Sequence, residues 1–143
     1  MMLVMLISNG TFSQSIDYNT KKGFVAQGYD VIAYFDNVAV EGKKEYTTEH
    51  DGVDYKFASK EHLETFKANP KKYIPQYGGY CAYAIADSKK VNIDPKSYQV
   101  MDGKLYLFYN SLFANTLKSW NEEGPEILKQ KADENWKSIM KKE

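Results

Sequence analysis

The pattern of apolar and polar residues around two Asp-Gly pairs predicts two β-hairpins: residues 53–57 alternate, and residues 104–109 are largely apolar. The first spans 45–57 and turns at Asp51-Gly52, and the second spans 98–109 and turns at Asp102-Gly103. An Asp-Gly pair suits a tight hairpin turn, because both central positions must adopt a positive φ angle. The run 31–35, Val-Ile-Ala-Tyr-Phe, is apolar and rich in β-branched and aromatic residues, and it predicts a further buried strand.

Apolar residues at helical spacing predict helices elsewhere in the chain. Ser59 is the expected N-cap of a short helix over 60–69, whose Leu63 and Phe66 point inward. Two further helices form the C-terminal tail, and Pro125 occupies a favourable first position in the second of them. The first tail helix is expected to be capped by Asn110 or Ser111 and to bury Phe113, Leu117 and Trp120, and the second to bury Leu128, Ala132, Trp136 and Met140.

These elements together predict a small single α+β domain. Its two β-hairpins are expected to form an antiparallel sheet, accompanied by short helices and the two-helix C-terminal tail. The chain has 143 residues, which suits one core, and its 15% aromatic residues provide ample apolar area to bury. Basic and acidic residues number 19 each, so the net charge is zero. The basic surplus of a nucleic-acid-binding protein is absent, and we expect no nucleic-acid partner.

The first fifteen residues have features of a secretory signal peptide. Met1–Ile7 is apolar, and small residues follow it, with cleavage expected near 13–15. No lysine or arginine precedes the run, so the leader is either truncated or an N-terminal core strand. The run is too short for a stable membrane span, which takes roughly 20 apolar residues. We therefore expect residues 1–15 to be a signal peptide, residues 16–143 to be the folded domain, and the protein to be periplasmic or secreted.

The residues available for chemistry are few. One cysteine excludes an internal disulfide and a four-thiolate zinc site. The sequence contains no GxxxxGK[ST], GxSxG, HExxH or CxxC motif, so no catalytic motif assigns an enzymatic activity. Cys81 follows Gly78-Gly79 near the start of a predicted helix, where the positive end of the helix dipole stabilises a thiolate. The alternative is a buried, inert cysteine.

Two histidines are the remaining candidate ligands for a soft metal. His62 lies one turn before Phe66 on the predicted short helix, and His50 directly precedes the first hairpin turn. A cysteine with one or two histidines suits copper or zinc. The alternatives are a half-exposed surface histidine at position 62 and a solvent-facing hairpin residue at position 50.

Residues 29–109 resemble the YHS-domain family, and specifically its small secreted branch of YHS domain-containing selenoprotein-like proteins. The resemblance is carried by Tyr29–Phe35, Tyr55–Ser59, Phe66, Asn69–Tyr73 and Gln76–Ala82, and is extended by Asp94-Pro95 and Gly103–Leu107. The most specific part is the segment Tyr77-Gly78-Gly79-Tyr80-Cys81-Ala82. The resemblance implies a small α+β fold, with its core over residues 29–109.

The resemblance also implies a functional role for Cys81. YHS domains in heavy-metal-transporting ATPases and metal-linked oxygenases carry a pair of cysteines where this chain has Ala58 and His62, so the thiol metal site of the wider family is not intact here. The secreted branch resembles proteins described as candidate selenoproteins, with selenocysteine at the position of Cys81. This implies a redox or soft-metal role for Cys81.

Three hypotheses of function follow. The first is a secreted or periplasmic protein that binds copper or zinc through Cys81, with His62 and His50 as further ligands. The second is a one-thiol redox protein in which Cys81 is the catalytic residue and an external partner completes the cycle, because no resolving cysteine is present. The third is a non-catalytic module that binds a small ligand or a partner through its aromatic surface.

Overall fold

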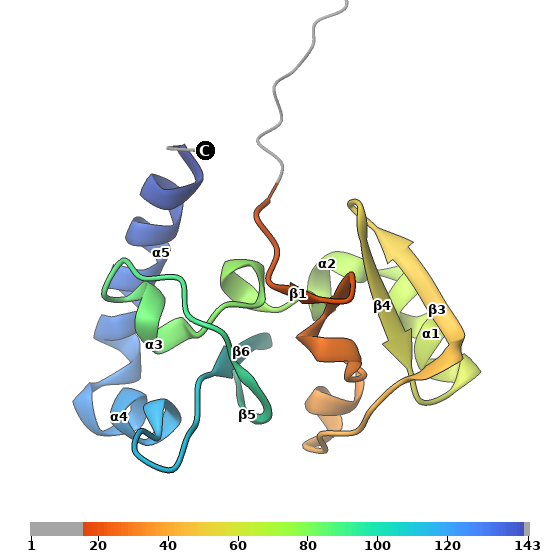
Figure 1. Cartoon of the computed structure of the whole chain (residues 1–143), viewed down its shortest axis with the longest axis horizontal. Helices are drawn as coiled ribbons and strands as arrows, with labels where there is room; N and C mark the ends of the chain where they lie inside the picture. Colours follow the sequence, from red (N-terminus) through yellow and green to blue (C-terminus); the bar gives the residue numbers. More distant parts are fainter. Residues whose placement is uncertain (1–15, 142–143) are drawn as a thin grey trace, which may run out of the picture.

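The computed structural model describes residues 16–141 and has the expected α+β architecture (Figure 1). The strands are β1 (Thr20–Lys21), β2 (Phe24–Val25), β3 (Lys43–His50), β4 (Val53–Phe57), β5 (Asp94–Met101) and β6 (Lys104–Phe108). The α-helices are α1 (Lys60–Ala68), α2 (Pro70–Tyr73), α3 (Ala82–Ile85), α4 (Thr116–Glu123) and α5 (Pro125–Lys141). Three 3₁₀ turns complete the fold: η1 (Ala26–Gly28), η2 (Ala33–Asp36) and η3 (Gln76–Gly79). The expected signal peptide, residues 1–15, lies outside the described residues.

Both predicted hairpins form. At the tips, Asp51, Gly52, Asp102 and Gly103 all have positive φ angles between 53° and 81°, as a primed turn requires. The two hairpins lie in separate sheets, however, and do not form the single antiparallel sheet expected. β4 has β3 on one edge and β2 on the other, with Phe24 opposite Asp54 in a parallel pair. Among the described strands, β5 and β6 pair only with each other.

The run 31–35 is buried as expected, but it is not a strand. The backbone N–H groups of Ile32 and Ala33 both donate to Oδ1 of Asp30, at 2.9 and 3.1 Å. This side-chain acceptor turns the chain directly into the short turn η2, which ends at Asn37 in the left-handed region. The strand prediction is therefore wrong, because a local carboxylate satisfies backbone groups that a strand would have offered to a neighbour.

The helices follow their predicted caps with one exception. Ser59 Oγ accepts from His62 N at the start of α1, and Pro125 begins α5. The first tail helix begins later than expected, because the side chain of Asn115, rather than that of Asn110 or Ser111, accepts from Lys118 N. Phe113 therefore lies outside α4 and is exposed, while Trp120 is fully buried.

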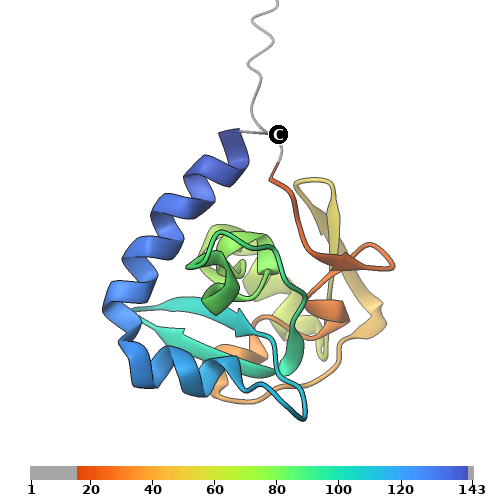
Figure 2. The same ribbon diagram turned by 60° about the vertical axis from the view of Figure 1, so that its left-hand side comes forward.

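One hydrophobic core runs between the two ends of the molecule. The hairpin β3–β4 and α1 lie at one end, and α3, α4 and α5 lie at the other (Figure 1). Figure 2 shows α5 along one flank, with α4 at its lower end. The largest fully buried side chains are Trp120, Tyr34, Tyr55, Tyr106, Phe57, Phe66 and Phe108. On α5, Ala132 is buried, and Leu128, Trp136 and Ile139 pack partly buried against the core.

Candidate functional site

Cys81 is completely enclosed. Its side chain has 0% exposure, and its Sγ lies 3.4 Å from Oγ1 of Thr116. Its backbone N–H donates to the carbonyl of Val91, at 3.0 Å. The residue precedes the four-residue helix α3, and its side chain makes no capping hydrogen bond. The partial exposure that a reactive thiol needs is therefore missing in this structure.

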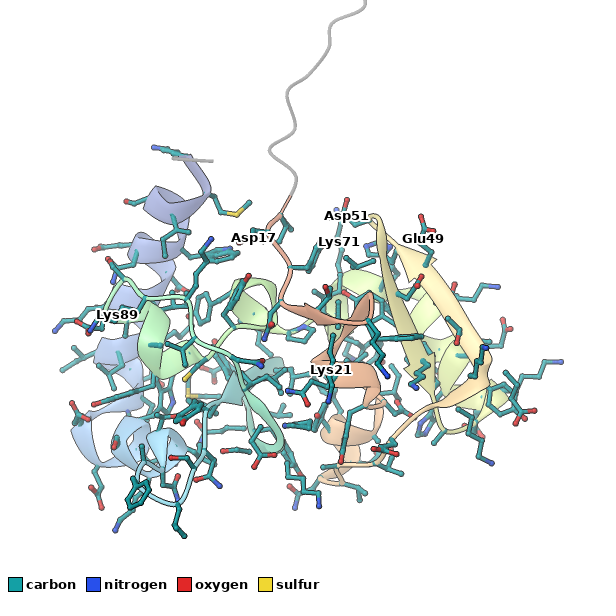
Figure 3. All side chains as sticks on the ribbon, in the orientation of Figure 1. Asp17, Lys21, Glu49, Asp51, Lys71 and Lys89 are labelled. Atoms are coloured by element: carbon teal, nitrogen blue, oxygen red, sulfur yellow. The ribbon has the colours of Figure 1, made fainter. Side chains whose placement is uncertain are left out.

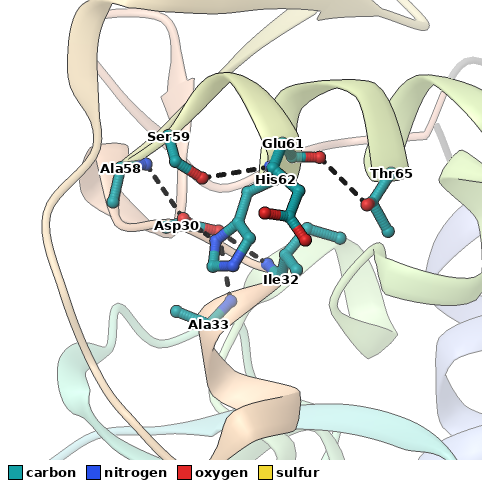
Figure 4. A network of polar contacts seen from close by, with 8 residues as sticks. All are labelled: Asp30, Ile32, Ala33, Ala58, Ser59, Glu61, His62 and Thr65. Atoms are coloured by element: carbon teal, nitrogen blue, oxygen red, sulfur yellow. Dashed lines mark hydrogen bonds and ion pairs between the residues drawn. The ribbon is translucent and has the colours of Figure 1, made fainter.

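His62 is held by a fully buried carboxylate. Oδ2 of Asp30 lies 2.6 Å from Nδ1 of His62 and accepts from Ala58 N at 2.9 Å, while Oδ1 accepts from Ile32 N and Ala33 N (Figure 4). Asp30 is 0% exposed and the His62 side chain 27% exposed. This pairing fixes the ring orientation and leaves Nε2 as the free nitrogen. In the described chain, Nε2 has no hydrogen-bond partner.

His50 is at the end of β3, in a third environment. Its ring packs edge-on against Phe66, with centroids 6.0 Å apart. Together with Phe66, Lys67 and Pro70, it lines a shallow hollow of about 210 Å³. This half-buried position agrees only in part with the solvent-facing alternative.

The structure places the three candidate ligands in separate surroundings. Cys81 pairs with Thr116, His62 with Asp30, and His50 with Phe66. Within residues 16–141, no group of three or more His, Cys, Asp or Glu side chains is arranged to hold a metal ion. A shared copper or zinc site built from Cys81, His62 and His50 is therefore not formed by these side chains in this conformation.

The glycine-rich segment before Cys81 has an unusual backbone. In η3, Tyr77, Gly78 and Gly79 have φ angles of 58°, 61° and 83°. Tyr77 is buried in the left-handed region, which is uncommon for a bulky residue and costs of the order of 1–3 kcal/mol. A Cβ at Gly78 would lie 2.5 Å from the carbonyl oxygen of Asp17 and 3.2 Å from Cη2 of Trp136. Glycine at position 78 thus allows two distant segments to approach the motif closely.

Hydrogen bonds join the N-terminal segment to this motif. Asn19 N donates to the carbonyl of Gly78, at 2.8 Å, and Asn19 Nδ2 donates to the carbonyl of Gly79, at 3.1 Å. On the other side, Tyr77 Oη donates to Oδ1 of Asp133 on α5, at 2.8 Å. Residues 76–79 therefore connect the start of the described chain to its last helix.

A pocket of about 220 Å³ opens at this junction. Its lining consists of Ile16, Tyr18, Lys71, Ile74, Pro75, Gln76, Tyr77, Gly78 and Trp136. The rings of Tyr77 and Trp136 meet nearly edge to face, with centroids 6.4 Å apart. We name this site the Tyr77–Trp136 pocket.

Lys71 is the one charged residue among the lining residues. It lies with Asp17 and Asp51 at the upper edge of the molecule as seen in Figure 3. Lys71 has no ion-pair partner among the described residues. Burial, followed by the hydrogen bond to Asp133, raises the pKa of Tyr77, and burial, followed by the hydrogen bond to Asp51, raises the pKa of Tyr18. Both phenols are therefore neutral at physiological pH. Lys71 is the one charged side chain of the lining, while the carboxylates of Asp51 and Asp133 lie 2.8 Å from the two hydroxyls.

Two residues of these sites were not singled out as functional from the sequence. The sequence predicts Trp136 in a buried helical stripe, and nothing in the pattern of Asn69–Tyr73 marks Lys71 as functional. One oxygen of Asp30 caps the turn at η2, and its second oxygen reaches His62 across 32 positions. The sequence feature that indicates this pocket is the pair of tyrosines, Tyr77 and Tyr80, on either side of Gly78-Gly79.

Comparison with known proteins gives no further assignment. Scans against family models, curated proteins and solved structures each find no match to this chain. The YHS resemblance thus rests on the residues quoted for it. Among the helices of residues 16–141, none is long and apolar enough to cross a bilayer.

Proposed function

We propose that the protein is a secreted or periplasmic binding module of the YHS kind, which holds a small aromatic carboxylate in the Tyr77–Trp136 pocket and performs no chemistry at Cys81. The observation that carries this proposal is the pocket itself: it is walled by the motif that is most specific to the family resemblance. The alternatives that need a reactive thiol are weakened by the complete enclosure of Cys81.

The lining favours a planar apolar ligand. Aromatic rings of Tyr18, Tyr77 and Trp136 face a volume of about 220 Å³, which suits a ligand of about one ring. Apolar walls with a few placed polar groups are the usual composition of a small-molecule site. The left-handed backbone at Tyr77 also supports a binding site here, because strained backbone conformations cluster at ligand-binding sites.

The charge of the pocket favours an anion. The ammonium group of Lys71 forms no ion pair within the described chain and is the one charged group of the lining. The neutral hydroxyls of Tyr18 and Tyr77 already donate to Asp51 and Asp133. A ligand carboxylate would therefore be recognised by Lys71, and the ring by the aromatic walls.

Fluorescence titration of the full chain tests this proposal. Trp136 is half-buried in the pocket and Trp120 is fully buried elsewhere, so ligand binding should change the emission of Trp136. The probe is phenylacetate, and its amide, phenylacetamide, keeps the ring but removes the charge. We expect phenylacetate to bind with a dissociation constant of about 1 mM, which corresponds to about 0.4 kcal/mol per non-hydrogen atom.

Matched variants separate charge recognition from general effects. Lys71→Ala should weaken phenylacetate binding about tenfold and leave phenylacetamide unchanged. Lys72→Ala is the control, because Lys72 lies over the ring of Tyr73 and does not line the pocket. Trp136→Phe should remove the signal. Equal binding of the acid and the amide, or equal effects at Lys71 and Lys72, would overturn the proposed ligand class.

One observation favours a second candidate function. A histidine that binds a metal usually donates its other ring N–H to a carboxylate, and Asp30 holds His62 in that way. Copper or zinc binding would then depend on Nε2 of His62, with water or a small molecule as further ligands. Calorimetric titration with each ion tests this: His62→Gln should abolish binding, while Cys81→Ser and His50→Gln should not. Binding lost in Cys81→Ser would instead favour the thiol.

A further inference from the structure

The chain contains one backbone arrangement twice. Residues 26–57 form the first unit and residues 77–108 the second, and each residue of the second unit lies 51 positions after its counterpart in the first. Each unit consists of a left-handed turn, a short helical turn and a β-hairpin with an Asp-Gly tip. Self-similarity at a fixed spacing is the signature of a structural repeat.

The two hairpins pair in the same register. The Cα partners of β3 and β4 are Lys43–Phe57, Thr47–Lys56, Thr48–Tyr55, Glu49–Asp54 and His50–Val53. All of these pairs recur 51 positions later in β5 and β6, as Asp94–Phe108, Tyr98–Leu107, Gln99–Tyr106, Val100–Leu105 and Met101–Lys104. Both hairpins also have a register shift between the first and the second of these pairs. An Asp-Gly turn fixes the pairs next to it, but it does not dictate an irregularity several residues away.

The segments before the hairpins match as well. Residues 26–28 and 77–79 all have positive φ angles, between 54° and 83°. In both turns the tyrosine that follows donates its N–H to the carbonyl of the first turn residue, at 3.0 Å. Asn37 and Ser88, again 51 positions apart, are left-handed with φ angles of 63° and 58°. Positive φ angles are uncommon outside glycine, so their recurrence at equivalent places indicates a true repeat.

Each unit also builds the same aromatic cluster with the helix that follows it. Two rings of the second hairpin strand contact one ring of that helix, and these rings are Tyr55, Phe57 and Phe66 in one cluster and Tyr106, Phe108 and Trp120 in the other. The centroids are 4.6 and 5.1 Å apart in the first cluster and 5.8 and 5.4 Å apart in the second. The hydroxyls of Tyr55 and Tyr106 are both buried, and neither has a hydrogen-bond partner in the described chain.

The sequences of the two units agree at nine of their 32 positions. The identical pairs are Gly28 and Gly79, Tyr29 and Tyr80, Ala33 and Ala84, Asp36 and Asp87, Val40 and Val91, Asp51 and Asp102, Gly52 and Gly103, Tyr55 and Tyr106, and Phe57 and Phe108. They include the hairpin tips and two rings of each aromatic cluster. Because most other pairs differ, the repeat is much clearer in the backbone than in the sequence.

The repeat gives Cys81 a counterpart in Asp30. Both side chains are 0% exposed. The N–H of Asp30 donates to the carbonyl of Val40, at 2.9 Å, and the N–H of Cys81 donates to that of Val91, at 3.0 Å. Both residues therefore occupy one place in the unit, directly after the left-handed turn and its tyrosine.

The two side chains also connect equivalent elements. In the first unit the carboxylate reaches Ala58 N, just after the hairpin, and His62 in the first turn of α1. In the second unit, Sγ of Cys81 lies 3.4 Å from Oγ1 of Thr116, the first residue of α4. That hydroxyl donates to the carbonyl of Tyr109, the counterpart of Ala58, at 2.5 Å. Because the hydroxyl proton is engaged there, the neutral thiol is the donor to Thr116.

We propose that the two units are copies of one ancestral unit, and that Cys81 is the structural counterpart of Asp30 rather than a reactive thiol. The Tyr77–Trp136 pocket then belongs to the second copy alone. Ala26 is the counterpart of Tyr77 and shares its left-handed backbone, so the turn itself does not require a large side chain. The repeat does not depend on ligand binding in that pocket.

A crystal structure of the full chain with Cys81→Asp tests the shared position. Oδ1 of Asp30 accepts from the N–H groups two and three positions ahead. At the equivalent place, the new carboxylate should accept from Tyr83 N and Ala84 N. Cys81→Ser is the second variant, should a buried carboxylate without a histidine prevent folding, and its hydroxyl oxygen should accept from Ala84 N as an N-cap serine does. Side chains directed away from these N–H groups would overturn the proposal, and so would different registers in the two hairpins.

Paired tyrosine variants test whether the two units are equivalent in stability. Tyr55→Phe and Tyr106→Phe each remove a buried hydroxyl without a partner, so both should keep or raise the urea midpoint of the wild type. Tyr34→Phe is the control, because its hydroxyl donates to the carbonyl of Pro95 at 2.6 Å, and its midpoint should fall. A fall in the midpoint of Tyr55→Phe or Tyr106→Phe would overturn the equivalence of the units.

Discussion

Asp30 is the residue that organises the first half of the molecule. Its two oxygens accept from Ile32 N, Ala33 N and Ala58 N and pair with His62, although the residue itself is fully buried. These contacts fix the turn η2, the end of β4 and the start of α1 relative to one another. The local contacts of Asp30 reach only two and three positions ahead, as aspartate side chains beside turns commonly do. Pairing with position 62 depends on the tertiary fold and could not be inferred from spacing.

Replacing Asp30 by Asn should destabilise the protein by about 2–4 kcal/mol. The amide group would offer a donor where the carboxylate oxygen accepts from Ala58 N and pairs with His62. Urea unfolding of Asp30→Asn measures the loss, with exposed Asp36→Asn as the control. A loss below about 0.5 kcal/mol, the range of ordinary surface substitutions, would contradict the structural role of Asp30.

Cys81 should resist alkylation as long as the protein is folded. Its sulfur is 0% exposed and lies against Thr116, so iodoacetamide can reach it only when the surrounding structure opens. The rate should therefore rise with urea in parallel with unfolding. Rapid labelling of the native protein near neutral pH would instead restore the thiol hypotheses.

Among the helices and hairpins, the predictions that the structure confirms are those that depend on contacts within a few residues. The Asp-Gly turns, the Ser59 cap and Pro125 act within a few residues, and each is found as predicted. The start of the first tail helix, predicted at Asn110 or Ser111, was wrong. Ser111 Oγ accepts from Phe113 N and Ala114 N in the preceding loop, and Asn115 caps the helix instead. The strand β2, which pairs with the second edge of β4, has only two residues and no periodic signal, so the sequence could not predict this neighbour.

The segment η3 offers a direct test of close packing. Gly78→Ala would introduce a Cβ 2.5 Å from the carbonyl oxygen of Asp17, in addition to the cost of a positive φ angle. Gly103→Ala is the matched control, because Gly103 also has a positive φ angle but a Cβ there would meet nothing within 4 Å. We expect Gly78→Ala to cost at least about 2 kcal/mol more than Gly103→Ala in urea unfolding. Equal costs would show that the N-terminal segment is not packed on the motif.

The whole molecule combines a predictable fold class with a site that the sequence indicated only in part. The aromatic cluster around Gly78-Gly79 was visible in the sequence, and so was the option of an aromatic binding surface. The pocket also needs Lys71 from α2 and Trp136 from α5, which meet η3 only through the tertiary fold. Thiol chemistry and the family resemblance both predicted a functional role for Cys81, whereas its burial depends on tertiary contacts such as that with Thr116 on α4.

Stability of the whole protein should fall steeply above about pH 10. Burial raises the pKa of Tyr34, Tyr55 and Tyr77 in the folded state. Above pH 10 the unfolded chain loses these protons while the folded chain keeps them, so the free energy of unfolding decreases. Three such tyrosines contribute about 4 kcal/mol per pH unit. Urea unfolding from about pH 8 to about pH 11 measures the slope, and a flat profile would contradict burial of the three hydroxyls.

The central claim, that the binding site is the Tyr77–Trp136 pocket and not the thiol, is tested most directly by NMR. Titrating the ¹⁵N-labelled full chain with phenylacetate should shift the amide signals of Gly78 and Gly79 and the indole signal of Trp136. The amide signals of Cys81, Thr116 and His62 should shift much less. Shifts centred on Cys81 and Thr116 or on His62, or no shifts at all, would contradict the claim.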